Sequence, residues 1–176
     1  IPEDLVLEGK QKKADYKKHP DSPEATFELA MNYAYTGRIE KGWEILKKVP
    51  PSYANTVVSV YGSKVASGNG TWKDHFKLAF GYYFKEKKED AKNEFKEVLK
   101  LQPKQVWAMG FIGLIEGDQG HNQVAIEWCK KALSIEPNAT AIHFLLAEGY
   151  RRTGNYFGGV GEIMIVGRLK TEEAAK

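Results

Sequence analysis

The chain has 176 residues, of which 42% are hydrophobic and 28% charged, and 26 Lys and Arg against 23 Asp and Glu give a formal net charge of +3. This composition is typical of a globular protein and excludes a disordered or fibrous chain. So small a charge excess gives no basis for predicting a nucleic-acid partner. The single cysteine, Cys129, excludes an intramolecular disulfide framework and a cysteine-based metal site.

The sequence offers no apolar run approaching the roughly 18 residues that a membrane span needs. We therefore expect any membrane contact to be indirect. The chain starts at Ile1 rather than at methionine. The compartment stays open between the cytoplasm and export after removal of a signal or an anchor.

The first third of the chain predicts a single helix, a two-helix unit and a second single helix. Residues 3–18 form a preceding helix that serves as a polar cap, and its basic block EGKQKKADYKKH is expected to be a solvated helix face. Residues 23–49 follow after the turn HPDSPE. Residues 53–66 have apolar side chains at helical spacing between VPPS and SGNG, which predicts one additional helix.

The remainder of the chain repeats with a period of 34 residues. Pro103 and Pro137 close the matching junctions LKLQPKQ and LSIEPNA, and the pairs Ala91 and Ala125, and Gly120 and Gly154, share that spacing. A period of this size predicts a solenoid, in which each unit buries its apolar face only by stacking on its neighbours.

These residues resemble the tetratricopeptide repeat family, whose first helix carries Leu-Gly and Tyr and whose second carries Ala and Phe before a proline. About four units match, at residues 23–49, 72–105, 106–139 and 140–170. Glu86 stands where the family has an inter-helix glycine, and Glu116 where it has a tyrosine. The resemblance implies an all-α fold, a right-handed α-solenoid of antiparallel helix hairpins with extra helices, as one domain over residues 1–176.

Elementary packing supports the same hairpins. Small residues fall where the two helices of a hairpin approach closely, and a large side chain there would cost about 1–3 kcal/mol; they are Gly42, Ala91, Ala125 and Gly159. Gly37, Gly120 and Gly154 lie at the predicted bends, where a left-handed residue ends a helix most easily.

One stripe of each first helix lines the concave groove in proteins of this family. Here the stripe is aromatic and aliphatic in its middle and basic at one end. The aromatic surplus favours a peptide-binding role over core packing, because so many exposed rings would exceed the apolar patch that a monomer tolerates. The expected binding residues are Phe76, Phe80, Tyr83, Phe84, Trp107, Phe111, Leu114, Phe144, Arg151 and Arg152.

The sequence supplies no catalytic or cofactor motif. It has no nucleophile elbow, phosphate loop or dinucleotide fingerprint, and no histidine pair at the spacing of a helical zinc site. We therefore predict that the protein is not an enzyme and binds no metal or cofactor. Phe27 and Met31 stand where family members that clamp a terminal carboxylate use polar groups, which argues against that subtype.

The last predicted helix carries apolar residues around much of its circumference, including Val160, Ile163 and Met164. A terminal repeat normally has a polar outer face. The leading hypothesis is a non-catalytic adaptor that binds an apolar or aromatic peptide or helix in its groove. The alternative is a structural subunit of a multiprotein assembly that self-associates through this helix, which makes a homo-oligomer the second kind of partner.

Overall fold

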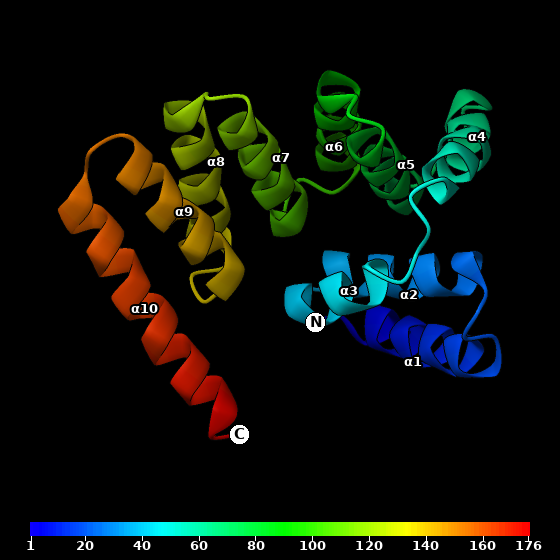
Figure 1. The fold of residues 1–176 in the computed structure, drawn as a ribbon, viewed down its shortest axis with the longest axis horizontal. Helices are drawn as coiled ribbons and strands as arrows, with labels where there is room; N and C mark the ends of the chain where they lie inside the picture. Colours follow the sequence, from blue (N-terminus) through cyan, green and yellow to red (C-terminus); the bar gives the residue numbers. More distant parts are fainter. The chain divides into compact units, whose positions relative to one another are not determined.

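The computed structural model describes residues 1–176 and consists of α-helices with no β-strand (Figure 1). The all-α class predicted from the sequence is confirmed. The helices are α1 (Glu3–Lys18), α2 (Pro23–Tyr35), α3 (Ile39–Leu46), α4 (Tyr53–Ala66), α5 (Trp72–Phe84), α6 (Lys88–Leu101), α7 (Val106–Asp118), α8 (Asn122–Ile135), α9 (Thr140–Arg152) and α10 (Tyr156–Ala174). None of them combines the length and the apolar composition needed to cross a membrane.

Local sequence sets where several helices begin. The Ser22 side chain accepts a hydrogen bond from the Ala25 amide at the start of α2, and Pro23 follows as its first residue. Thr71 and Asp74 form a reciprocal capping box at the start of α5. These contacts satisfy amides that a helix leaves without intrahelical partners.

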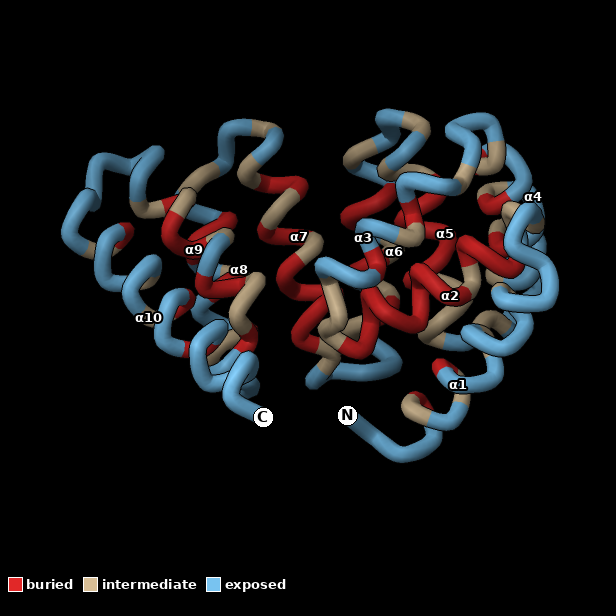
Figure 2. Tube along the Cα trace, turned by 60° about the horizontal axis from the view of Figure 1, so that its bottom comes forward, coloured by how far each residue is buried: buried red, intermediate tan, exposed pale blue.

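The chain divides into two compact units, residues 1–91 and residues 92–176. In the first unit α1 packs on α2, α2 on α3, and α4 on α5; in the second, α7 to α10 pack successively on one another, and α7 also contacts α9. Within each unit the helices turn buried faces toward their neighbours (Figure 2). The single domain over residues 1–176 stays a prediction.

Helices within a hairpin approach closely at small residues. A Cβ atom at Gly42 of α3 would lie 3.2 Å from the Tyr33 Cβ and 3.3 Å from the Ala30 carbonyl oxygen of α2. Gly159 of α10 takes the same place against α9, where a Cβ atom would lie 3.4 Å from the Ala147 carbonyl oxygen. A larger side chain at Gly42 therefore has to push α2 and α3 apart.

The hairpin bends share one backbone conformation. Gly37, Gly120 and Gly154 have φ angles of 82°, 83° and 81°. Glu86 takes the equivalent place between α5 and α6 with φ of 60°, the only non-glycine residue with positive φ. Its side chain is exposed. The repeat imposes the left-handed bend whatever residue occupies it, so Glu86 carries a backbone strain that the glycines do not.

Replacing Glu86 by glycine is therefore expected to stabilise the protein, by about 1 kcal/mol, because the left-handed conformation costs an L-residue roughly 1–2 kcal/mol and glycine gives part of that back in unfolded-state entropy. Urea denaturation followed by circular dichroism measures the change. Lys85→Gly is the control: Lys85 has φ of −89°, so glycine there is expected to be neutral or destabilising. A Glu86→Gly protein no more stable than wild type would contradict the expectation.

Candidate protein-binding surfaces

In the first unit, the predicted aromatic stripe of α5 runs from the interior to the surface. Phe76 and Phe80 are buried, Tyr83 is half-buried and Phe84 is exposed. The Phe76 ring contacts Tyr35 of α2, with centroids 5.5 Å apart, and Phe80 at the same distance. The Phe80 ring in turn lies 6.0 Å from Phe84. The first two rings thus pack between helices, and Tyr83 and Phe84 are the accessible members on α5.

In the second unit, the stripe crosses α7 and α9. Trp107 is buried, whereas Phe111 and Leu114 are half-buried. The Phe111 ring stacks on Phe95 of α6, with centroids 5.5 Å apart and an interplanar angle of 17°. Phe144 of α9 is 58% exposed. The accessible apolar surface of this unit's first helices therefore centres on Phe144.

Arg151 and Arg152 share one carboxylate at the end of α9. Arg151 donates to Glu148 from Nε at 2.8 Å and from Nη2 at 2.6 Å, and Arg152 donates to it from Nε at 2.8 Å. These hydrogen bonds lower the pKa of Glu148 to about 2. Arg152 also donates from Nη1 to the Gly117 carbonyl oxygen at 2.9 Å, which ties α9 to the end of α7. The cluster keeps a net charge of +1 at the surface.

A shallow, open recess lies beside Arg152. It is lined by residues of α7, α8 and α9, including Leu114, Asn122, Leu145, Gly149 and Arg152. The Asn122 Oδ1 atom is buried without a hydrogen-bond partner. The lining combines apolar side chains such as Leu114 and Leu145 with the charged side chains of Asp118, Glu148 and Arg152.

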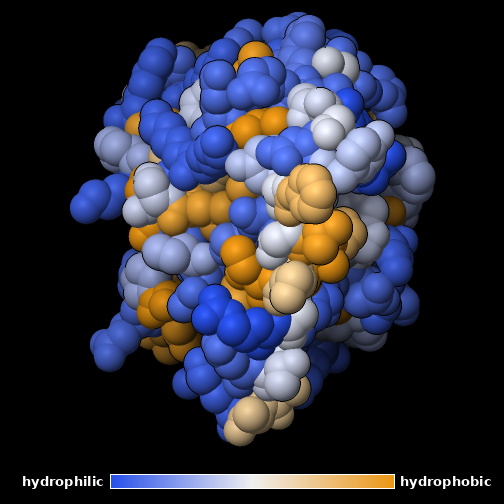
Figure 3. Space-filling view, turned by 90° about the vertical axis from the view of Figure 1, so that its left-hand side faces the viewer, coloured by the Kyte–Doolittle hydropathy of each residue, from blue (hydrophilic) through white to orange (hydrophobic).

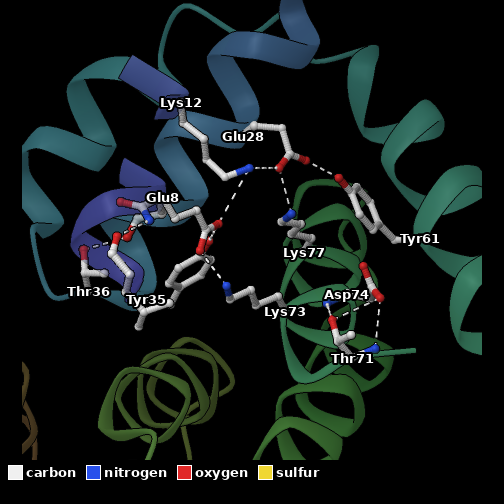
Figure 4. A network of polar contacts seen from close by, with 12 residues as sticks. Glu8, Lys12, Glu28, Tyr35, Thr36, Tyr61, Thr71, Lys73, Asp74 and Lys77 are labelled. Atoms are coloured by element: carbon white, nitrogen blue, oxygen red, sulfur yellow. Dashed lines mark hydrogen bonds and ion pairs between the residues drawn. The ribbon is translucent and has the colours of Figure 1, made fainter. Parts of the chain in front are cut away.

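A network of charged groups and tyrosines joins four helices of the first unit (Figure 4). Glu28 of α2 accepts hydrogen bonds from Lys12 of α1 and Lys77 of α5, each at 2.7 Å, and from the Tyr61 hydroxyl of α4. Lys77 is buried and Glu28 nearly so. Since a buried charge is tolerated only when paired and hydrogen-bonded, this carboxylate connects α1, α2, α4 and α5.

A second carboxylate extends the network. Glu8 of α1 accepts from the Tyr35 hydroxyl and from Lys73 of α5, the latter at 2.5 Å. Sequence reasoning missed this role, because the basic block around Lys12 is typical of a solvated helix face. The signal was present on the aromatic stripe itself, where Glu28, Lys73 and Lys77 interrupt the apolar positions.

The pKa of Glu28 shows what holds it charged. Burial acts to raise this pKa, but the charge of Lys77 and the hydrogen bonds from Lys12, Lys77 and Tyr61 outweigh burial and lower it to about 2. The ionised carboxylate is therefore the form that the folded unit stabilises.

Glu116 contacts Lys92 and His121 within the second unit. Glu116 of α7 is buried and accepts from Lys92 of α6 at 3.0 Å, while its second oxygen lies 2.7 Å from the His121 Nδ1. Where the family has a tyrosine, this chain therefore has Glu116, which forms a buried ion pair with Lys92.

The two ring nitrogens of His143 of α9 contact α10 and the turn before α9. The Nδ1 atom lies 2.5 Å from a Glu162 oxygen of α10, and the Nε2 atom 2.6 Å from the Pro137 carbonyl oxygen. These two contacts fix the orientation of the ring between α10 and the turn that precedes α9.

The outer side of α10 carries a stripe of exposed apolar side chains. Tyr156, Phe157, Val160, Ile163 and Met164 are 70%, 95%, 60%, 49% and 71% exposed. Figure 3 looks onto this side of the second unit and shows a line of apolar groups between hydrophilic ones. We name these five residues the α10 stripe. Scattered apolar residues are normal on a surface, but a contiguous set of this kind marks an interaction site.

Comparison with known proteins bears on the hairpin of α7 and α8. Residues 108–139 match the model of the tetratricopeptide repeat. These residues form one tetratricopeptide repeat. The resemblance predicted from the motifs is thereby confirmed. No curated protein sequence matches the chain.

Solved structures of MamA are similar in fold. A crystal structure of MamA superimposes with a TM-score of 0.58 at 18% identity, covering 96% of this chain and 90% of that chain. The ArsTM double mutant of MamA RS-1 gives 0.63 at 14% identity, covering 96% and 86%. MamA MSR-1 gives 0.57 at 19% identity, covering 86% and 79%. The predicted solenoid of tetratricopeptide-like hairpins is confirmed as the fold class.

The repeat and the fold support a protein–protein interaction scaffold. Tetratricopeptide repeats are generally non-catalytic modules that present extended surfaces to other proteins. The surfaces available here are the first-helix face of the second unit, the exposed end of α5 and the α10 stripe.

Removing the Glu28 carboxylate tests the network. Glu28→Gln is expected to destabilise the protein by about 3 kcal/mol at pH 7, because it leaves the buried Lys77 charge without its partner. The folded-state pKa of about 2 lies below the ordinary 4.5, so the stabilisation is complete above pH 4.5 and is lost as the pH falls toward 2. Urea denaturation at pH 7, 4.5 and 3 measures the difference.

Glu44→Gln is the matched control, since Glu44 is exposed and pairs only with Lys47, and it is expected to change stability by less than about 0.5 kcal/mol. If the difference in free energy of unfolding between Glu28→Gln and wild type stays constant from pH 7 to pH 3, the ionised Glu28 carboxylate is not what stabilises the network.

Proposed function

We propose that the protein is a non-catalytic adaptor that binds an apolar or aromatic-anchored segment of a partner on the first-helix face of its second unit. The observation that carries this proposal is Phe144, a large ring left 58% exposed on a helix whose other apolar residues are mostly packed. Exposed rings beside packed neighbours are where binding energy concentrates at interfaces.

The surroundings of Phe144 suit such a partner. Phe111 and Leu114 supply half-buried apolar surface on α7, and the recess beside Leu114 offers room for one apolar side chain. Arg151, which keeps a donor free of Glu148 and lies at the surface, would orient an acidic group.

The other predicted binding residues take two roles in this proposal. Phe76 and Phe80 are buried and pack α5 within the first unit, and Trp107 is buried in α7 of the second unit. Tyr83 and Phe84 are a second accessible aromatic site, on the first unit. Arg152 links α7 to α9 through Gly117. Because the helices that carry the face are already packed in the free protein, binding orders fewer groups and loses less conformational entropy.

The test is a comparative affinity capture with Phe144→Ser. A partner that binds through this face is expected to lose about 30-fold in affinity, the usual effect of removing an interface aromatic. Trp43→Ser is the matched control, because Trp43 is also a half-exposed ring but lies on α3. Equal thermal melting of the variants shows that they are folded. A set of captured proteins identical for wild type, Phe144→Ser and Trp43→Ser would reject the face.

Self-association through α10 is the second candidate function. The observation that favours it is the α10 stripe, whose five apolar side chains are half to almost fully exposed. Burying a large apolar side chain yields about 1.5–3 kcal/mol, so a surface of this kind favours association with a complementary one.

Self-association predicts a molar mass that rises with protein concentration. Sedimentation velocity between about 1 and 100 µM is expected to show dimers at the upper end, the micromolar range being typical of small interfaces. Phe157→Ser is expected to shift the midpoint to higher concentration, because Phe157 is the most exposed residue of the stripe. Trp43→Ser again serves as control and is expected to match wild type.

A further inference from the structure

The α10 stripe has the spacing of a helix-pairing seam. Tyr156, Val160, Ile163 and Gly167 follow one another at intervals of 4, 3 and 4 residues, which places them in one line along the helix. Phe157 and Met164 flank that line on one side. Gly167 faces open space, because a methyl group on its Cα would meet no neighbouring atom within 4 Å. The seam is therefore three turns long, with the Tyr156 ring at one end and Gly167, which has no side chain, at the other.

The repeat period shows how this face differs from an ordinary stacking face. Val160 and Ile163 stand 34 residues after Ile126 and Cys129 of α8, which are 2% and 1% exposed in the packed second unit. The three most exposed members of the stripe instead replace polar residues of α8. Tyr156, Phe157 and Met164 correspond to Asn122, Gln123 and Lys130.

This difference decides the kind of occupant. A further stacked helix would cover the positions of Val160 and Ile163, as α9 covers α8. It would leave Tyr156, Phe157 and Met164 exposed to water, at positions where α8 has the polar residues Asn122, Gln123 and Lys130. An occupant that buries all five residues has to follow the whole seam.

We infer that two copies of the chain pair through α10 in an antiparallel, two-fold arrangement, an inference that rests on the proposed self-association. In an isologous pair residue i contacts residue j of the partner copy while j contacts i. Antiparallel alignment of the seam sets Val160 against Ile163 of the second copy, twice. It also sets Tyr156 over Gly167, so that the largest side chain meets the smallest. Phe157 comes beside Met164, a favourable ring–sulfur contact.

The helix dipoles favour the antiparallel direction. The charged side chains toward the C-terminal end of α10 are mixed, since Arg168 and Lys170 accompany Glu172 and Glu173, and they favour neither direction. Antiparallel copies bring the partly negative C-terminal end of one helix to the partly positive N-terminal end of the other. Parallel copies would set ends of the same sign beside each other.

The area is sufficient for a specific contact. A Phe or Tyr side chain buries about 150–250 Å² when it leaves water, so the five side chains of two copies would bury on the order of 1,000 Å². That total reaches the lower range of specific interfaces, about 1,000 Å². Two copies therefore suffice to cover the stripe without any other chain.

A charge exchange across the central layer tests the pairing on the full chain. Val160→Lys alone and Ile163→Glu alone each place two like charges in the seam and are expected to weaken dimerisation at least about 100-fold. An equimolar mixture of the two is expected to restore a dimer, because one layer then holds a Lys–Glu pair and the other keeps Ile163 against Val160. Sedimentation velocity measures the mass, and thermal melting shows that both variants are folded.

A mixture of Val160→Lys with Val160→Glu is the matched control and is expected to stay monomeric, since residue 160 faces residue 163 in the antiparallel pair. Restoration by this control instead of the first mixture would overturn the antiparallel arrangement. If the wild-type protein dimerises but neither mixture of variants forms a dimer, the pairing through this seam is overturned and self-association itself still stands. A wild-type protein that stays monomeric at about 100 µM would overturn both.

Discussion

A helix hairpin of this length can bury only one side of itself, and every element of this protein depends on how the other side is covered. Close approach at Gly42 and Gly159 lets the two helices of a hairpin share a face. Neighbouring helices then cover the remaining apolar positions, as α9 covers Ile126 of α8 at Gly149. The same constraint explains why α10, whose outer side has no such neighbour in the chain, exposes its apolar residues.

The helical class and the family resemblance could be predicted from the sequence because both follow from short-range patterns. The 34-residue spacing of Pro103 and Pro137 and the bend glycines report on single hairpins. Even the departure at Glu86 was informative, since the residue adopts the positive φ that the repeat demands of glycine there. Such features depend on backbone geometry within about one repeat.

Which aromatic residues stay accessible could not be predicted in the same way. Phe76 and Phe144 occupy comparable places on first helices, yet the first is enclosed by Tyr35 and Phe80 and the second is exposed. Lys12 looks solvated in its basic block but reaches Glu28, 16 residues away. These outcomes depend on tertiary contacts between helices, which periodicity does not encode.

The buried contact of Lys92 with Glu116 has a consequence for how far the repeats are interchangeable. Tetratricopeptide units invite exchange, because each resembles the next. Here Lys92 of α6 contacts Glu116, which stands in α7 where the family pattern has tyrosine. Grafting a consensus unit with tyrosine at that place would remove this buried carboxylate from Lys92. A chimera or shuffled array built from this chain therefore has to keep Lys92 and Glu116 together, although the two residues lie on different helix hairpins.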